Sequence, residues 1–334
     1  MSLIIPIFIP HVGCPHDCVF CNQKKIAGTV TPPTLYDVSS IIENALSKSG
    51  KGAEVAFYGG SFTAIESELM TGYLSAAHRF IERGDVSHIR LSTRPDCISE
   101  DILETLWSFG VRTIELGAQS MNDSVLLKAG RGHTAEDTEK SARLIKSFGF
   151  SLILQMMTNL PGSSNELDIE TAKKIASLSP DGVRIYPTVV IRDTALESLW
   201  RCGKYTPQTP DEAASLGAEL ISIFEEKDIP IIRFGLNPTD DLSSGDALCG
   251  PYHPALGEMA QAARYLALAT EKVEKENLRG GELSLFVSPK RVSAMAGLRK
   301  SNKLFLMEKY GFSSVSIRGD ASLRSGEVRL SNSK

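Results

Sequence analysis

The chain has 334 residues, of which 42% are hydrophobic and 23% charged, as is typical of a folded globular protein. Its 36 Lys and Arg residues against 40 Asp and Glu leave a net charge of −4. This balance argues against a protein that binds nucleic acid over most of its surface, but it allows a local basic patch.

The N-terminal segment, residues 1–10, is apolar but short. It has no basic region and no small-residue cleavage motif, and it contains Pro6 and Pro10, so we do not expect a signal peptide. No stretch reaches the roughly 18 apolar residues that cross a bilayer. We therefore expect a cytoplasmic protein without membrane segments.

Apolar runs of strand length alternate with amphipathic helical patterns along most of the chain. The predicted strands are 3–9, 53–58, 88–92, 113–116, 152–157, 182–186 and 230–234. The predicted helices between them are 38–46, 66–81, 100–109, 134–148, 166–178 and 210–226. This alternation predicts right-handed βαβ units and an α/β fold: a partial or full (β/α) TIM-like barrel of parallel strands. Functional residues then belong in the loops after the strands.

The composition changes beyond residue 236. A segment rich in Asp, Ser, Gly and Pro predicts a loop over 237–250, and a helix is expected near 256–275. The tail predicts a strand, a helix, a glycine-containing turn, a second helix and a strand pair. We therefore expect three parts: a barrel over 1–236, a loop and helical extension over 237–280, and a small α+β module over 281–334.

Three of the six cysteines follow the first predicted strand. Six are too few for a disulfide scaffold, and Cys14, Cys18 and Cys21 have the spacing Cys-x3-Cys-x2-Cys. Three thiolates on one short loop can hold three irons of a [4Fe–4S] cluster and leave the fourth iron open to a ligand. A zinc site completed by His11 or His16 is the alternative.

Glycines and polar residues stand at other strand ends. The candidates are Gly59, Gly60, Ser61, Ser92, Gln119, Arg131 and Gln155. Paired glycines let a ligand approach the backbone closely, although a tight turn explains them equally well. Arg131 lies just before the predicted helix 134–148, and His133 and Thr134 could merely start that helix, with Thr134 as its N-cap.

These motifs resemble the radical S-adenosylmethionine (SAM) superfamily, whose signature has this cysteine spacing with an aromatic residue, here Phe20, before the third cysteine. Five further strings resemble, in order and spacing, the radical SAM domain of the catalytic subunit of Elongator. They are 93–96, 115–120, 131–134, 160–162 and 185–192. Oxygen-independent coproporphyrinogen oxidase is a more distant relative. The resemblance covers about residues 4–205, and the chain leaves no room for an acetyltransferase domain, so we do not expect tRNA carboxymethylation.

The resemblance implies a [4Fe–4S] cluster on Cys14, Cys18 and Cys21 with SAM at the open iron. One electron, from a donor such as ferredoxin or flavodoxin, would cleave SAM to a 5′-deoxyadenosyl radical that takes a hydrogen atom from the substrate. The SAM-binding residues that the resemblance implies are Phe20, Gly59, Gly60, Ser61, Ser92, Gln119, Arg131 and Gln155.

The tail resembles a minimal KH-like fold, although its turn, 297–300, lacks the second glycine of a Gly-x-x-Gly loop. Five positive charges lie in the fourteen residues 290–303 around this turn: Lys290, Arg291, Arg299, Lys300 and Lys303. In an acidic protein this local excess predicts an anionic partner such as RNA. A solvated basic face is the alternative.

Cys249 is the candidate catalytic residue outside the cluster loop. It could donate a hydrogen atom to a substrate radical or accept an alkyl group, whereas a lone cysteine is more often simply buried. Tyr186 and Tyr252 are weaker candidates, and Cys97 and Cys202 are not expected to have a chemical role.

The sequence therefore predicts a radical SAM enzyme that modifies RNA such as tRNA or rRNA. Two alternatives stay open: a radical SAM enzyme acting on a small molecule or peptide, and a non-catalytic RNA-binding protein with an Fe–S or zinc site. No motif identifies the substrate, the fate of SAM or the oligomeric state.

Overall fold

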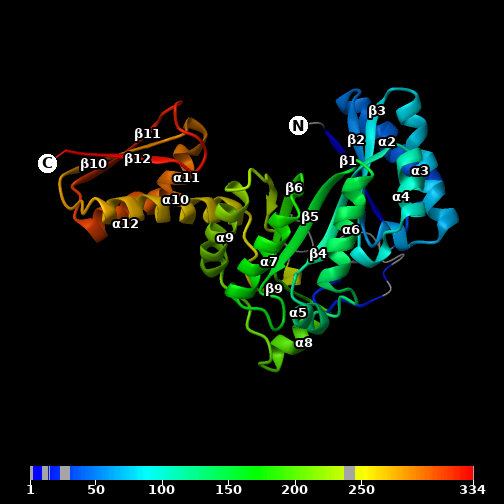
Figure 1. Ribbon diagram of the computed structural model, residues 1–334, viewed down its shortest axis with the longest axis horizontal. Helices are drawn as coiled ribbons and strands as arrows, with labels where there is room; N and C mark the ends of the chain where they lie inside the picture. Colours follow the sequence, from blue (N-terminus) through cyan, green and yellow to red (C-terminus); the bar gives the residue numbers. More distant parts are fainter. Residues whose placement is uncertain (1–2, 10–13, 15, 23–30, 237–244, 334) are drawn as a thin grey trace. The chain divides into compact units, whose positions relative to one another are not determined.

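The structure is a computed structural model, which describes residues 3–9, 14, 16–22, 31–236 and 245–333 (Figure 1). By its internal contacts the chain divides into two units. The first unit comprises Met1–Pro207 and Asn237–Gly250, and the second comprises Gln208–Leu236 and Pro251–Lys334.

This division differs from the predicted boundaries at residues 236 and 280. Helix α9 (Pro210–Glu225), which we expected in the barrel, belongs to the second unit with α10 (Leu256–Lys275). The two helices pack closely because α9 has a glycine at the contact: a Cβ atom on Gly217 would lie only 2.8 Å from the Cβ of Ala260. Residues 237–244 of the predicted loop lie outside the described residues.

The first unit is built on a parallel sheet in which each strand pairs with the next one along the chain. Its strands are β1 (Ile4–Ile9), β2 (Ala53–Gly59), β3 (Val86–Thr93), β4 (Val111–Gln119), β5 (Ser151–Thr158) and β6 (Gly182–Pro187). Its main helices are α2 (Leu35–Ser49), α3 (Ser67–Glu82), α4 (Glu100–Ser108), α6 (Ala135–Ser147) and α7 (Asn165–Ser177). The predicted α/β fold with a partial TIM-like barrel is confirmed.

Smaller elements complete the first unit at the carboxyl end of the sheet. They are α5 (Asp123–Lys128), β7 (Val190–Ile191), α8 (Ala195–Arg201) and β9 (Ala247–Cys249). Strands β7 and β9 pair antiparallel. Thr134 caps α6 as predicted, in a capping box with Asp137.

The two faces of the sheet differ in polarity because side chains alternate along each strand. Phe57 of β2 packs against Tyr73 of α3, with ring centroids 6.1 Å apart, so this face lies against the helices. The neighbouring Tyr58 lies on the opposite face, where its hydroxyl donates a hydrogen bond to Glu115 of β4. The face away from the helices is therefore the polar one.

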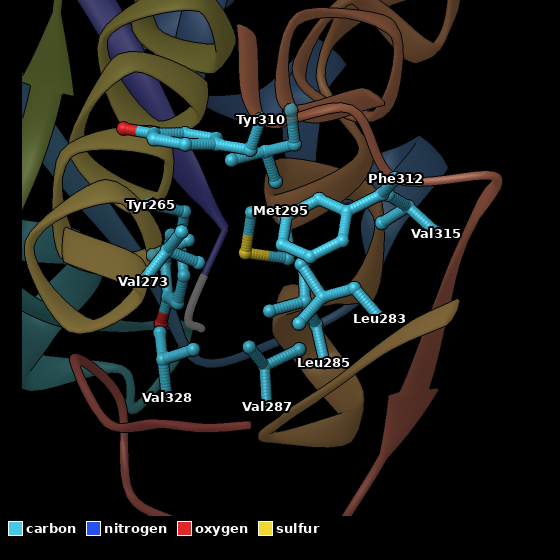
Figure 2. Close-up of a cluster of buried hydrophobic side chains, with 12 residues drawn as sticks. Tyr265, Val273, Leu283, Leu285, Val287, Met295, Tyr310, Phe312, Val315 and Val328 are labelled. Atoms are coloured by element: carbon cyan, nitrogen blue, oxygen red, sulfur yellow. The ribbon is translucent and has the colours of Figure 1, made fainter. Parts of the chain in front are cut away.

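The second unit holds a three-stranded sheet packed on helices. Its remaining elements are β8 (Ile231–Phe234), β10 (Glu282–Val287), α11 (Val292–Ala296), α12 (Ser301–Tyr310), β11 (Ser314–Gly319) and β12 (Val328–Ser333). The buried core joins α10 to the sheet and to α11 and α12, with Met295 between Tyr265 and Leu285 (Figure 2).

The predicted order of elements in this tail is confirmed, but the predicted pairing of its last two strands is wrong. The sheet order is β11-β10-β12, with β10 parallel to β11 and antiparallel to β12. Helices α11 and α12 form the crossover that makes β10 and β11 parallel, so the other edge of β10 stays open for β12.

Candidate active site

The cysteine loop after β1 is held in place by main-chain contacts from segments far along the chain. The amide of Val19 donates to the carbonyl of Ala129 at 3.0 Å, and the amide of Leu196 in α8 donates to the carbonyl of Val19 at 2.7 Å. The side chain of Asn22 donates to the carbonyl of Arg192 at 3.1 Å. These bonds fix the loop between α5 and α8, at the carboxyl end of the sheet.

Two glycines let the segment after α5 lie directly against the cysteine loop. Gly130 and Gly132 have φ of 69° and 74°, in the left-handed region that favours glycine. A Cβ on Gly130 would lie 3.0 Å from the carbonyl oxygen of Asp17, and one on Gly132 would lie 2.2 Å from Nε2 of His16. A side chain at either position would push the loop away.

Arg131, between these glycines, reaches the cysteines. Its guanidinium donates to Sγ of Cys18 at 3.3 Å and to the carbonyl of Gly117 at 2.7 Å, and the residue is 7% exposed. The contact brings together two residues that the sequence predicted separately for one site.

A second arginine supports Arg131. The buried Arg94 donates to the carbonyl of Arg131 and pairs with Asp96 at 2.9 Å. Burial opposes ionisation of Asp96, but the hydrogen bond and charge of Arg94 outweigh it and lower the pKa of that carboxyl. The sequence predicts no role for Arg94, since nothing local to it indicates a contact with a residue 37 positions further on.

His133 is a further buried neighbour, for which the sequence predicts no role in the site. Its Nε2 lies 3.1 Å from the carbonyl of Ala118, and it is 4% exposed. Burial, reinforced by the charge of Arg131, lowers its pKa to about 4. The ring is therefore neutral at pH 7, and Nε2 carries the proton that it donates to Ala118.

The predicted glycine motif closes the other side of the loop. Gly59, with φ of 115°, ends β2 so close to β1 that a Cβ would lie 2.5 Å from the carbonyl oxygen of Ile9. The amide of Gly60 donates to that same oxygen at 3.0 Å. Ser61 is buried, and its hydroxyl lies 3.8 Å from Sγ of Cys14. This motif and the first cysteine are therefore neighbours.

Gln119 ends β4 with the backbone in the left-handed region, at φ of 63°. Its side chain is buried, and within the described part of the chain its Oε1 atom has no hydrogen-bond partner. A buried amide oxygen without a partner is costly, so a group that donates to it is expected at this point.

A layer of paired charges lies on the polar face of the sheet. Glu115 accepts hydrogen bonds from side chains of the strands on both sides: Tyr58 at 3.0 Å, Arg90 at 3.2 Å, Gln155 at 2.9 Å and Arg184 at 3.0 Å. Burial and the charge of Glu115 raise the pKa of Tyr58 to about 12.

Two predicted SAM-binding residues belong to this polar layer or border it. Gln155 is part of it, and Ser92, half-buried on β3, stands opposite Glu115 in the strand register. The layer itself was not predicted. Its sequence signal is a charged residue inside each of three apolar strands, at Arg90, Glu115 and Arg184.

Phe20 and Cys249 share one apolar cluster. Both pack against Val190, Leu196 and Tyr205, and Cys249 stands opposite Val190 in the β7–β9 pair. The structure thus brings Cys249 to the apolar surroundings of the cysteine loop.

The other two cysteines lie elsewhere in the first unit. Burial and the nearby Asp96 raise the pKa of Cys97 to about 11, which keeps it a thiol. Cys202 is exposed at the end of α8 and donates to the carbonyl of Ser198.

The five predicted RNA-binding residues differ in exposure. Lys290, Arg299 and Lys300 are exposed and Lys303 is half-buried. Arg291 lies 3.8 Å from a carboxylate oxygen of Glu225 and 3.1 Å from the hydroxyl of Ser325. Arg299 and Lys300 both have left-handed backbones, at φ of 52° and 65°.

The donor set fits an iron–sulfur cluster chemically. Cys14, Cys18 and Cys21 are all thiols rather than disulfides. Among the residues that the structure describes, no three Cys, His, Asp or Glu side chains converge closely enough to hold a metal ion. His11, one of the two alternative zinc ligands, lies outside the described residues, and His16 lies against Gly132. No described helix is long and apolar enough to cross a membrane.

Residues 8–175 match the radical SAM superfamily, and residues 180–267 match the radical SAM C-terminal domain. The chain belongs to the radical SAM superfamily. Radical SAM proteins bind a [4Fe–4S] cluster and SAM, and require an electron donor. The chain is accordingly a radical SAM enzyme.

Relatives of the Elongator branch are similar over part of the chain. Human Elongator complex protein 3 is 34% identical over 138 residues, which are 40% of this chain and 25% of that protein. The tRNA uridine(34) acetyltransferase of Methanocaldococcus infernus is 37% identical over 126 residues, 37% of this chain and 24% of that protein. The chain thus spans about a quarter of the length of these curated relatives.

Two solved structures share the fold. The archaeal Methanocaldococcus infernus Elp3 with an N-terminal deletion superposes with a TM-score of 0.61 and 25% identity, covering 83% of this chain and 64% of that one. Streptococcus suis SuiB bound to S-adenosylmethionine has a TM-score of 0.51 and 14% identity, covering 73% and 49%, which is a likeness of fold alone. The predicted resemblance to the Elongator branch is confirmed.

Proposed function

We propose that this radical SAM enzyme modifies RNA. The observation that carries the proposal is the similarity to a protein named tRNA uridine(34) acetyltransferase over the region that matches the radical SAM superfamily. The exposed cations at residues 290, 299 and 300 support it. Because the chain spans only a quarter of that relative, we take over the class of substrate and not the acetyl transfer.

The cysteine loop would hold the cluster. In this proposal Cys14, Cys18 and Cys21 are the three protein ligands. When bound, the cluster and SAM together supply one-electron reductive cleavage of SAM. Arg131 has the structural role of holding Cys18 in place, because its donor contact to Sγ is itself fixed by the carbonyl of Gly117.

The groups around the loop would bind SAM. Gly59, Gly60 and Ser61 would bind SAM through main-chain groups, at a position that the contact of Ser61 with Cys14 places beside the cysteine loop. The free Oε1 of Gln119 is suited to accept a hydrogen bond from an amino or hydroxyl group.

The remaining predicted contacts have narrower roles. Arg131 is suited to a carboxylate. Ser92 would contribute a hydroxyl, and Phe20 would contribute an apolar contact beside Cys21. The side-chain amide nitrogen of Gln155 donates a hydrogen bond to Glu115, so Gln155 would contact SAM only through its side-chain carbonyl oxygen.

The basic turn of the second unit would bind RNA phosphates. Arg299 and Lys300 lie in a backbone conformation that ordinary residues adopt at a cost of about 1–3 kcal/mol each, and such strain clusters at binding sites. We extend this role to Lys290 and Lys303, and we assign Arg291 to the ion pair with Glu225. The enzyme would act in the cytoplasm with a donor such as ferredoxin or flavodoxin.

We propose that Cys249 reacts after SAM cleavage, by donating a hydrogen atom to the substrate radical or accepting an alkyl group. It lies in the same apolar cluster as Phe20 of the cysteine loop. A Cys249→Ala variant should still release 5′-deoxyadenosine from SAM but should form no modified product. Equal product formation by the variant and the wild type would remove Cys249 from the mechanism.

The test of the proposal has two stages. Protein reconstituted with iron and sulfide without oxygen, then given reductant and SAM, should release 5′-deoxyadenosine, and Cys18→Ala should not. Mass spectrometry of RNA from a deletion strain should then show a lost modification that the wild-type gene restores and the Cys18→Ala gene does not. If the deletion strain has the same RNA modifications as the wild type, RNA is not the substrate, and the assignment to the radical SAM superfamily is unaffected.

A further inference from the structure

The sheet of the second unit has one face packed and one face open. Leu283, Leu285 and Val287 of β10 point into the core with the helices (Figure 2). Because side chains alternate along a strand, Ser284 and Phe286 of β10 point to the opposite face. Both are only half-buried. The function proposed above uses nothing on that face.

An aromatic ring lies between two arginines across this open face. Phe286 stands opposite Arg318 of β11 and opposite Arg329 of β12 in the strand register. Side chains directly opposite on neighbouring strands are in contact range. The guanidinium of Arg329 lies over the Phe286 ring, 4.6 Å from its centroid, and both arginines are exposed.

Hydroxyl groups form the next row of the same face. Ser284 stands opposite Ser316 and Ser331, and the hydroxyls of Ser284 and Ser316 are 2.9 Å apart. This face also carries two carboxylates: Asp320 is bound to Arg329 at 2.5 Å, and the exposed Glu282 at the start of β10 shares the alternation of Ser284 and Phe286. The face thus combines a ring, two guanidinium groups and three hydroxyls.

The charge of the tail complements an anion. Residues 281–334 contain ten Lys and Arg against four Asp and Glu, in a chain whose total charge is −4. A polyanion whose bases are free to stack matches the ring and the guanidinium groups of this face: guanidinium groups bind phosphates, and both rings and guanidinium planes stack on bases. A duplex keeps its bases stacked inside and cannot present them to Phe286.

We propose that the open face of the β11-β10-β12 sheet binds single-stranded RNA, with a base stacked on Phe286 and phosphates on Arg318 and Arg329. The proposal rests on the proposed function, in that RNA is the substrate. It adds a second surface to the basic turn at 297–300, and it selects unpaired segments of the RNA. A loop or a tail, rather than a helix, would then be brought to the enzyme.

The test uses the full-length protein and a labelled oligouridylate, with a blunt-ended RNA duplex that has no unpaired bases as the comparison. Phe286→Ser should weaken binding of the single strand about ten-fold, since base stacking on an aromatic side chain carries that much affinity. Phe286→Tyr, which keeps the ring, should bind as the wild type does. Arg318→Gln should lower the slope of the logarithm of affinity against the logarithm of salt by about 0.7.

The controls separate this face from charge in general. Arg324→Gln removes an exposed cation of the same unit that lies between β11 and β12, and it should leave stacking-dependent binding unchanged. Arg318→Gln does not touch the core, so it tests the face even if Phe286→Ser fails to fold.

Three outcomes would overturn the proposal. If the wild type binds neither RNA, the proposed RNA substrate falls as well. If the wild type binds oligouridylate and Phe286→Ser binds it equally, the sheet face alone is excluded. If Phe286→Ser changes sedimentation from dimer to monomer and leaves RNA binding intact, the face is a contact between two copies of the chain.

Discussion

The two sheets of this chain use arginine in opposite ways. On the polar face of the first sheet, Arg90 and Arg184 are largely buried and bound to Glu115. On the open face of the second sheet, Arg318 and Arg329 are exposed, although Arg329 also pairs with Asp320, and residues 281–334 contain ten Lys and Arg against four Asp and Glu. A charge removed from water must be paired within the protein, whereas an exposed one is available to a partner. The first arrangement stabilises the fold, and the second is suited to binding.

The largest expected effect comes from breaking the buried pairing. Glu115→Ala leaves the largely buried Arg184 without its carboxylate and leaves Arg90 with Glu54 alone, and breaking a buried pair in this way typically costs about 3–5 kcal/mol. Urea unfolding followed by tryptophan fluorescence measures it, because both tryptophans, Trp107 and Trp200, lie in the first unit. A loss below about 1 kcal/mol would show that the layer does not depend on Glu115.

Acid should unfold the first unit through His133. The pKa of His133 is about 4 in the folded chain against 6.5 as its reference value, because of burial and the charge of Arg131. The unfolded chain therefore binds the proton first, so stability falls as the pH drops from 6.5 towards 4, by about 3 kcal/mol in all.

The glutamine variant of this histidine isolates the effect. His133→Gln cannot gain the proton, so its stability should change less between pH 6.5 and 4 than that of the wild type. Measurement of the urea midpoint at several pH values gives both slopes. Parallel slopes for the two proteins would contradict the assignment.

A smaller effect is expected where the cysteine loop meets α5. Gly132→Ala forces a Cβ against His16 at a backbone of φ 74° and should displace the loop, at about 1–3 kcal/mol. Iron and sulfide content after anaerobic reconstitution should fall. Gly203→Ala is the matched control, because it has a similar φ of 69° and no atom within 4 Å of the added Cβ. Equal loss in both variants would mean that backbone strain, not the contact, is responsible.

The smallest effect is expected on the open sheet. Arg318→Gln should leave the free energy of unfolding within about 0.5 kcal/mol of the wild type, since exposed charges contribute little to stability. Thermal unfolding by circular dichroism checks this. A larger loss would indicate that Arg318 packs as a structural residue, which would remove the contrast between the two sheets.

The predictable parts of this structure are those that a local pattern determines. Alternating strands and helices gave the α/β barrel, and the spacing of Cys14, Cys18 and Cys21 indicated the cofactor. The pairing of Arg131 with Cys18, 113 residues apart, could not be read from either string alone. The same holds for the Glu115 layer and for the row at Phe286, because each requires the register of strands that the sequence does not specify locally. The boundary at α9 was missed because a glycine contact between two helices carries no periodic signal.

The contacts that hold the cysteine loop have a consequence for the order of assembly. Asn22 is bound by a residue 170 positions later, and Cys18 by one 113 positions later. During synthesis the cysteines leave the ribosome first, and their supports follow only when most of the first unit has been made. Iron delivered before then would meet three thiols on an unstructured segment, so correct loading belongs to the folded chain, late in synthesis or after it.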